Sequence, residues 1–318
     1  MLRIRPYDVS LKRSWDSFVL GSKNGTFLFF RDYMEYHADR FHDHSLVILD
    51  GDEVVGLLPA SASGTTLVSH AGLTYGGVVS GPSMRTATML GTFRALGAHL
   101  AALGFERLVY KAVPHIYHSQ PAEEDLYALT RFGARLYRRD VSSAIPMSRR
   151  LPVSKGRRWA LKQANAAGMV VAQSEDFEGF MALEEAVLSA KYGVRPVHSA
   201  EELRLLAGRF PRHIKLFVAT RGAAVEAGVV VYEDRRVAHA QYIATSDDGR
   251  RLGALDLVMA HLLTEVYVDK PYFDFGISTE REGRYLNEGL VRNKEGYGAR
   301  AIVHDFYEIE IGAMTEAP

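Results

Sequence analysis

The tetrapeptide Phe132-Gly133-Ala134-Arg135 recurs almost unchanged as Tyr297-Gly298-Ala299-Arg300, and an aspartate follows each copy at the same distance. Upstream, Ser69-His70-Ala71 has a counterpart in Ala238-His239-Ala240 at a nearly equal offset. An ordered series of matches at a nearly constant offset is typical of an internal repeat. We therefore interpret the chain as two copies of one unit.

The hydrophobic pattern around these matches is also the same in both halves. Each histidine follows two short apolar runs and precedes an amphipathic segment, at residues 89–103 in the first half and 254–268 in the second. A strand-like apolar run follows, at residues 107–112 and 272–277. Short apolar runs predict strands and the 3.6-residue spacing predicts helices. The pattern predicts a tandem α+β duplication.

A short polar connection bracketed by Pro146 and Pro152 separates the two copies. It places the expected domains at residues 1–148 and 149–318. Residues 312–318 have no apolar periodicity and are expected to form a loose tail.

Composition narrows the classes of function. The 318 residues include no cysteine, which excludes disulfide scaffolds, cysteine-ligated metals and thiol catalysis. Lys plus Arg and Asp plus Glu each number 38, so no general affinity for polyanions follows. The N-terminus is charged where a signal peptide needs an apolar core, and no apolar run is long enough for a membrane span. We expect a cytoplasmic protein without a metal.

Two motifs of the second half point to a family. The stretch 248–254 reads Asp-Gly-Arg-Arg-Leu-Gly-Ala after an expected strand, and 273–276 reads Phe-Asp-Phe-Gly. With the order of elements, they resemble the GNAT acyltransferases, specifically the FemAB-like branch with two GNAT-type domains in one chain. The resemblance implies a GNAT-like mixed central sheet flanked by helices in each half. It also implies transfer of an acyl or aminoacyl group to an amine, commonly on a glycan or cell-envelope precursor.

GNAT proteins bind the pyrophosphate of coenzyme A on a loop patterned Arg/Gln-x-x-Gly-x-Gly/Ala that opens a helix. Arg250-x-x-Gly253 fits this pattern, while Leu255 stands at the final small position and Ala254 one place before it. Unpaired amides at a helix N-terminus suit phosphate. We expect these residues and Arg251 to hold acetyl-CoA or another acyl-CoA on the second domain. The alternative is an ordinary charged turn before an amphipathic helix.

Acyl transfer to an amine needs a base, a polarised carbonyl and a fixed geometry. His239 is one candidate base; the alternative, which the duplication favours, is that His239 and its counterpart His70 are core histidines. Asp274 is the other, because an acid inside an apolar run must be paired or line a cleft. Backbone amides near Tyr242 would polarise the carbonyl. Asn287 and Lys294 follow the same strand and are expected to line the cleft on the donor side or cap the next helix.

The first half is expected to bind the acceptor. His70 and Tyr75 lie in a glycine-rich stretch that permits close approach of a ligand or simply forms a turn. Lys111 ends the following strand, and His37 ends a polar helix upstream. These four side chains are the candidates for acceptor binding, against packed or solvated roles.

Residues 131–162 include ten basic residues and one acid. This stretch is either a solvated face or a site for a phosphate-rich ligand such as a nucleotide sugar, a lipid pyrophosphate, CoA or an aminoacyl-tRNA. Arg157 and Arg158 are the expected substrate contacts within it.

Two other functions stay open. An aminoacyl-tRNA could replace acyl-CoA as the donor, although residues 174–212 leave room for about two ordinary helices and no long helical arm. Alternatively, the chain could be a non-catalytic, GNAT-like ligand-binding protein. The expected partner is a small-molecule or glycan-linked amine, with no nucleic acid apart from aminoacyl-tRNA.

Overall fold

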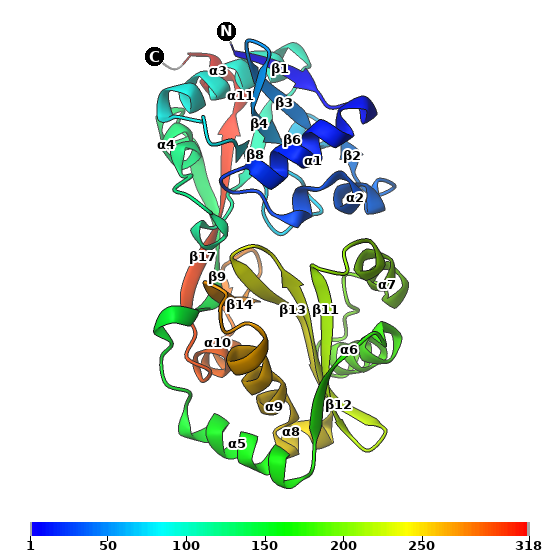
Figure 1. The fold of residues 1–318 in the computed structure, drawn as a ribbon. Coiled ribbons are helices and arrows are strands. Elements are labelled where there is room, and N and C mark those ends of the chain that lie inside the picture. Colours follow the sequence, from blue (N-terminus) through cyan, green and yellow to red (C-terminus); the bar gives the residue numbers. More distant parts are fainter. Residues whose placement is uncertain (1, 317–318) are drawn as a thin grey trace. The chain divides into compact units, whose positions relative to one another are not determined.

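The computed structural model describes residues 2–316, without the side chains of residues 191, 192 and 316. Contacts within the chain divide it into two compact units (Figure 1). Unit 1 comprises Met1–Asp140, Arg281–Tyr285 and Val303–Pro318, and unit 2 comprises Val141–Glu280 and Leu286–Ile302. Each unit contains a mixed sheet with helices, which confirms the predicted α+β class.

The last strand of each sequence half contributes to both units. Strand β9 (Arg135–Pro146) passes into unit 2 at Val141, and strand β17 (Arg300–Glu310) passes into unit 1 at Val303. The two units therefore differ from the continuous segments 1–148 and 149–318 that the sequence suggests.

Unit 1 contains two sheets. Strands β1, β3, β4 and β7 form an antiparallel sheet in that order, and β17 continues through β8, β6, β5 and β2. Among the strand pairs of unit 1 whose register is described, β6 and β8 run parallel and the others run antiparallel. The strands are β1 (Leu2–Pro6), β2 (His42–Asp43), β3 (Leu46–Asp50), β4 (Glu53–Leu58), β5 (Ser61–Ser63), β6 (Thr66–Val68), β7 (Val79–Ser80) and β8 (Arg107–Lys111). The helices are α1 (Lys12–Gly21), α2 (Arg31–Met34), α3 (Thr86–Ala102), α4 (Glu124–Arg131) and α11 (Ile311–Glu316).

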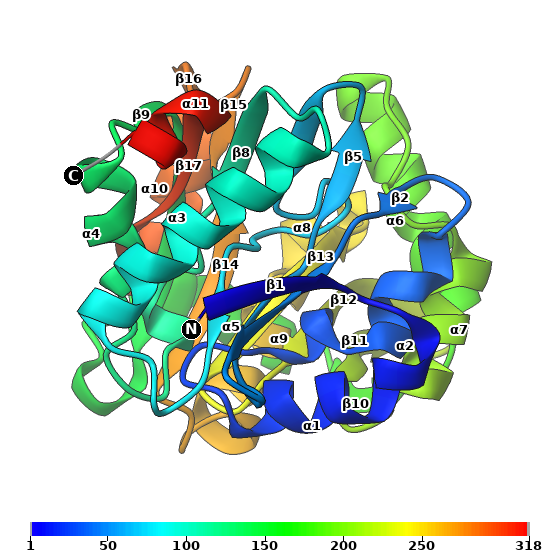
Figure 2. The same ribbon diagram turned by 90° about the horizontal axis from the view of Figure 1, so that it is seen from above.

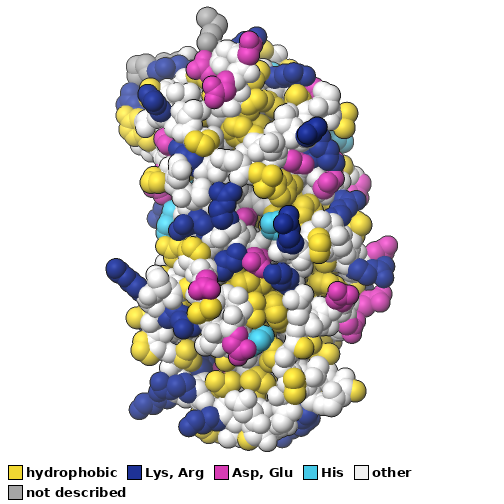
Figure 3. All heavy atoms as spheres, in the orientation of Figure 1, with side chains coloured by type: hydrophobic (Ala, Val, Ile, Leu, Met, Phe, Trp, Pro, Cys, Tyr) yellow, Lys and Arg dark blue, Asp and Glu magenta, His cyan; other side chains and the backbone are white. Residues whose placement is uncertain are grey.

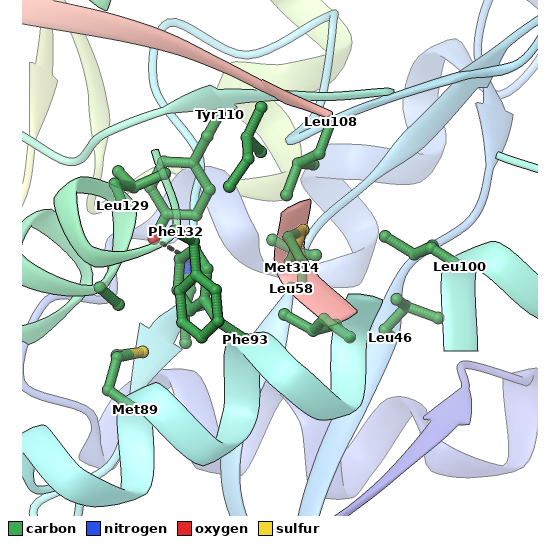
Figure 4. Close-up of a cluster of buried hydrophobic side chains, with 14 of the residues drawn as sticks. Leu46, Leu58, Met89, Phe93, Leu100, Leu108, Tyr110, Leu129, Phe132 and Met314 are labelled. Carbon is green, nitrogen blue, oxygen red and sulfur yellow. Dashed lines mark hydrogen bonds between the residues drawn. The ribbon is translucent and has the colours of Figure 1, made fainter. Parts of the chain in front are cut away.

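Helix α3 organises the core of unit 1. Its buried side chains Met89, Phe93, Leu96 and Leu100 recur every three or four residues, so one face of the helix is apolar. This face packs with strands β3, β4 and β8 in a single hydrophobic cluster (Figure 4). Helix α11 lies beside α3 (Figure 2).

The C-terminal segment is not the loose tail expected from the sequence. Residues up to 316 form α11, and Ile311 and Met314 are buried in the cluster around α3. Gly97 of α3 lies directly against Met314, where a Cβ would collide with it. Residues 317 and 318 lie outside the described part of the chain.

Unit 2 has one sheet in the order β10-β11-β12-β13-β14-β9. Its pairs are antiparallel except β13 with β14, which run parallel. The strands are β10 (Val170–Ser174), β11 (Ile214–Arg221), β12 (Ala224–Glu233), β13 (Val237–Thr245) and β14 (Tyr272–Ile277), with short β15 (Thr279–Glu280) and β16 (Tyr285–Leu286) after them. The helices are α5 (Lys155–Ala166), α6 (Phe177–Tyr192), α7 (Ala200–Arg209), α8 (Asp247–Leu252), α9 (Ala254–His261) and α10 (Glu288–Glu295).

Small residues on β11 and β12 let α9 approach the sheet closely. Ala219 and Ala227 share a buried cluster with Val258 and Met259 of α9. The helix expected over residues 254–268 ends as an α-helix at His261 and continues as a π-helical turn, η6 (Leu262–Val266). Helices α6 and α7 are the two ordinary helices expected between residues 174 and 212.

No helix in the described part of the chain is long and apolar enough to span a membrane.

We predict that Met314→Ala lowers the free energy of unfolding by about 2–5 kcal/mol, because it empties a fully buried site against α3. Urea unfolding followed by circular dichroism measures this loss. Thr315→Ala, at the exposed neighbouring position, is the matched control and should change little. Equal, small effects of both substitutions would contradict the docking of α11.

Candidate functional site

The sheet of unit 2 opens between its two parallel strands. Register pairing of β13 with β14 ends at His239 and Asp274. On its other side β14 pairs with β9 from Tyr272 to Ile277, with an irregular register between Asp274 and Ile277 and a positive φ of 76° at Gly276. Glycine adopts this left-handed conformation without steric cost, so it allows the strand to turn away here.

A bulge turns β13 in the same region. Val230 of β12 lies opposite Tyr242 of β13, and the next residue, Val231, lies opposite Ala240. Gln241 is therefore an extra residue in β13. Bulges bend a strand and redirect its side chains. After the bulge, Ile243 packs against the core and also lines a cavity.

A buried carboxylate holds the strands together where they are still paired. Asp274 is fully buried, and its Oδ2 lies 2.7 Å from Nδ1 of His239 on β13. Ser142 on β9 donates to Oδ1 at 2.7 Å, and the Gly276 amide approaches the same oxygen at 3.3 Å. The two residues expected as alternative bases thus form one hydrogen-bonded group, and neither lines the cavity described below.

Lys294 of α10 braces the diverging end of β14. Its ammonium donates to the carbonyls of Gly276 and Ile277 and to Oγ of Ser278, each at 2.8 Å. Burial lowers the pKa of Lys294 to about 8, although the negative charge of Asp274 acts in the opposite direction and raises it. Lys294 also lines the cavity, so it contributes a positive charge to the cavity wall.

Asn287 caps helix α10 and does not line the cavity. Its side chain accepts from the Leu290 amide at 3.0 Å and donates to Glu280 at 2.9 Å. Of the two roles that the sequence left open for this residue, the structure shows the helix cap.

A cavity of about 420 Å³ lies beside the separated strand ends, within unit 2. Its wall comes from β13, β14, α6, α9, α10 and the helical turn α8. The lining residues expected from the sequence are Arg157, Arg250, Gly253 and Lys294.

Glu184 of α6 is the acid in this wall that sequence reasoning missed. It is 6% exposed, and no hydrogen bond or ion pair to it occurs among the side chains that the structure describes. Burial raises the pKa of Glu184 to about 7. The available signal was its place on the apolar face of α6, three and four residues after Met181 and Phe180.

Several polar side chains of the loop and helical turn after β13 form hydrogen bonds or ion pairs within unit 2. Ser246 caps α8 by accepting from the Gly249 amide at 2.8 Å, and its hydroxyl donates to Glu226 at 2.5 Å. Arg251 pairs with Asp248 at 2.9 Å and lies outside the cavity wall. Ser246 therefore already satisfies one of the unpaired amides in the first turn of α8.

Arg250 and the start of α9 remain open to the cavity. Arg250 is exposed and has only a 3.9 Å ion pair with Asp247. Gly253 begins α9 in a left-handed conformation without a side-chain cap, and a Cβ here would collide with the Ala160 carbonyl. Ala254, expected at the donor site, is instead buried in the core.

Two further expected residues have their own partners. Arg157 lies 3.2 Å from Asp256 and 4.3 Å from the centre of the Tyr297 ring, which places a paired guanidinium in the cavity wall. Tyr242 is buried, and its hydroxyl hydrogen-bonds Nδ1 of His198. The Tyr242 side chain is thus engaged on another part of the unit.

The expected acceptor residues form a buried group in unit 1. The rings of His37 and His70 stack at 5.4 Å, and burial lowers both pKa values, that of His70 to about 3. Lys111 donates to the carbonyls of His70 and Leu73, and burial lowers its pKa to about 7. Tyr75 donates to Thr26 at 3.3 Å. These side chains share a compact interior cluster rather than an open surface.

No cluster of three or more histidine, aspartate or glutamate side chains suited to a metal ion occurs among residues 2–316.

The comparisons with known proteins agree with this architecture. Residues 147–285 match the family model of the GNAT acetyltransferase domain, and this segment contains the opened sheet and most of the cavity wall. Residues 147–285 are thus similar to a GNAT acetyltransferase domain, and the solved structures share the tandem GNAT-like fold, which confirms the predicted resemblance to FemAB-like proteins.

Solved structures of the same fold cover almost the whole chain. FemX has a TM-score of 0.66 at 10% identity over 96% of both chains. L-PGS from Bacillus licheniformis has a TM-score of 0.58 at 12% identity, over 94% of this chain and 99% of its own. A tandem GNAT protein from the clavulanic acid biosynthesis pathway has a TM-score of 0.51 at 16% identity, over 98% and 99%. The comparison with curated proteins gave no match.

We predict that Glu184→Gln stabilises the protein at high pH. The folded-state pKa of about 7 lies above the ordinary value of 4.5, so wild-type stability falls as pH rises between these values. The amide removes that penalty and should add on the order of 1–3 kcal/mol at pH 8, with little change at pH 4.5. Urea unfolding at both pH values measures the difference.

Glu185→Gln is the matched control, because Glu185 is exposed and pairs with Arg195 on the surface. A gain at pH 8 that is the same for both variants would contradict the burial of Glu184.

Proposed function

We propose that the protein is an N-acyltransferase that binds an acyl-CoA in the unit 2 cavity and transfers the acyl group to an amine. The observation that carries this proposal is the pairing of an open strand edge with an unpartnered buried acid, Glu184, in one cavity. Such a cavity offers two of the three things that acyl transfer to an amine needs, backbone groups that can polarise the carbonyl and a base.

The strand edge suits the donor's extended arm. Beyond Ala240, β13 has no ladder partner on the β14 side within the described chain. The pantetheine arm of CoA carries two amides and is extended, so it can add to such an edge as a short strand does. Arg250 and the uncapped start of α9 at Gly253 then supply charge and amides for the pyrophosphate.

Glu184 has the properties of a general base at neutral pH. In the proposed reaction the neutral amine attacks the thioester carbonyl, and the new C–N bond places the negative charge on the carbonyl oxygen. Backbone amides of the open β13 edge stabilise this oxygen. The carboxylate of Glu184 takes the proton from the nitrogen. The C–S bond then breaks, and the departing thiolate receives that proton to leave as free CoA.

The clamp of His239 and Asp274 has a positioning role in this proposal. It fixes the point where the strands separate, while neither side chain borders the cavity. Lys294 contributes positive charge next to the separated strands. The acceptor in this proposal is an amine on a glycan or cell-envelope precursor, the class that the FemAB-like resemblance implies.

Calorimetric titration with acetyl-CoA tests the donor site. Arg250→Glu should weaken the affinity at least about tenfold, because it replaces an exposed cavity cation by an anion. Arg251→Glu is the matched control, since Arg251 pairs with Asp248 outside the cavity. Binding of deacylated tRNA in place of acetyl-CoA would instead assign the donor to aminoacyl-tRNA.

Turnover tests the base. With a panel of amino-sugar acceptors, kcat/KM should rise with pH until the Glu184 pKa of about 7 is passed. Glu184→Gln should lose on the order of 10²–10⁴ in rate while acetyl-CoA still binds, and Glu185→Gln should keep the wild-type rate. Donor binding without any turnover in the wild type would favour a non-catalytic ligand-binding protein.

A further inference from the structure

A second cavity of unit 2 shares Arg157, Asp256 and Tyr297 with the wall of the first. Its volume of about 460 Å³ lies within the range of about 300–1,000 Å³ typical of ligand pockets. It is formed by the connection before α5, by α5 itself and by the end of α9 with the turn η6. We propose that this cavity binds an anionic amphiphile, a lipid-type molecule with one apolar chain and a phosphate head. The proposal does not rest on the acyltransferase function.

The walls of this cavity are apolar. Leu151, Pro152 and Val153 come from the connection, Leu161 from α5, and Ala260 and Leu263 from the opposite side. Leu151 is exposed at 41%, so an apolar side chain stands at the surface of the cavity. Covering such a wall with an alkyl chain removes apolar area from water, which is favourable.

The polar part of the wall favours an anion. Three arginines, Arg150, Arg157 and Arg158, face one acid, Asp256. Asp256 already pairs with Arg157, and Arg150 donates to the Leu263 carbonyl at 2.6 Å. Arg158 is exposed and has no ion pair among the described side chains. A phosphate head would therefore meet an unpaired guanidinium, which can bind it through two parallel hydrogen bonds.

The cavity also includes an unusual backbone element. Leu263 and Thr264 belong to the π-helical turn η6, which interrupts the regular helix after His261. Such turns are rare and frequently occur at functional sites. The Leu263 carbonyl that accepts a hydrogen bond from Arg150 belongs to this turn. This irregularity is independent of the charge argument.

The surface next to the cavity has the composition of a lipid-contacting helix. Trp159 on α5 is 60% exposed between Lys155, Arg158 and Lys162, and no ion pair to these three cations occurs in the described part of the chain. Lys and Arg side chains gather over the region of α5 (Figures 1 and 3). Tryptophan and basic residues on one helix are typical of contact with anionic lipid surfaces. An apolar cavity beside them favours a lipid over an RNA backbone.

Titration of the full-length protein with dodecyl phosphate, below its aggregation threshold and without acyl-CoA, tests the proposal. Calorimetry gives the affinity, and the fluorescence of Trp159 should change while buried Trp15 in unit 1 supplies a constant background. Arg158→Glu and Leu161→Gln should each weaken binding by about tenfold or more, through loss of the anion contact and of the apolar wall.

Arg204→Glu on α7 is the matched control, because it makes the same substitution at an exposed arginine outside the cavity wall. It should keep the affinity within about twofold. If Leu161→Gln does not fold, Leu151→Ser at the exposed edge of the cavity replaces it. Acetyl-CoA should bind the Leu161 variant with the wild-type affinity. The two titrations therefore test the amphiphile site and the donor site independently.

Three results would overturn the proposal. One is equal loss of dodecyl phosphate binding in the Arg158 and Arg204 variants. Another is binding of dodecyl phosphate no tighter than that of inorganic phosphate or of dodecyl maltoside. The third is binding of an RNA oligonucleotide that depends on Arg158 but not on Leu161, together with no response to dodecyl phosphate.

Discussion

The buried carboxylate of Asp274 is the constraint on which the rest of unit 2 depends. A charge without access to water must be matched by donors, and His239 and Ser142 supply them from the two neighbouring strands. Removing one partner of such a group typically costs about 3–5 kcal/mol. Three strands are therefore held in register at one level of the sheet. Beyond that level, the bulge at Gln241 and the left-handed Gly276 turn the strands apart.

Different residues beside the opened sheet stabilise the fold and, in the proposed reaction, transfer the proton. The clamp and the hydrogen bonds of Lys294 satisfy the polar groups on one side of the opening. On the other side Glu184 is buried and has no partner among the described side chains, an arrangement that destabilises the fold at neutral pH. Strongly shifted pKa values cluster at functional sites, which is why we propose this acid, rather than His239 or Asp274, for the proton transfer.

Much of the fold follows from the sequence because it depends on local patterns. The repeat of the Gly-Ala-Arg motif, the apolar runs and the 3.6-residue spacing predicted the duplication, the α+β class and strand β14 at its observed limits. The transfer of β9 and β17 between units has no local signal, since it depends on which sheet edge each strand meets after folding. The docking of α11 likewise depends on Met314 finding the space left by Gly97, far away in the chain. The site was predicted less completely: the sequence singled out Arg250, Gly253, Lys294 and Arg157 of the cavity wall. It did not single out Glu184, because its importance depends on which face of α6 packs inward.

Hydrogen–deuterium exchange with and without saturating acetyl-CoA tests the central claim most directly, because it reports where the donor binds by its effect on backbone amides. The account predicts slower exchange in the end of β13, in the α8–α9 junction and in α10, with the segment 86–111 of unit 1 unchanged. Slower exchange confined to unit 1, or no change in any segment at saturation, would contradict the placement of the donor beside the open edge of β13.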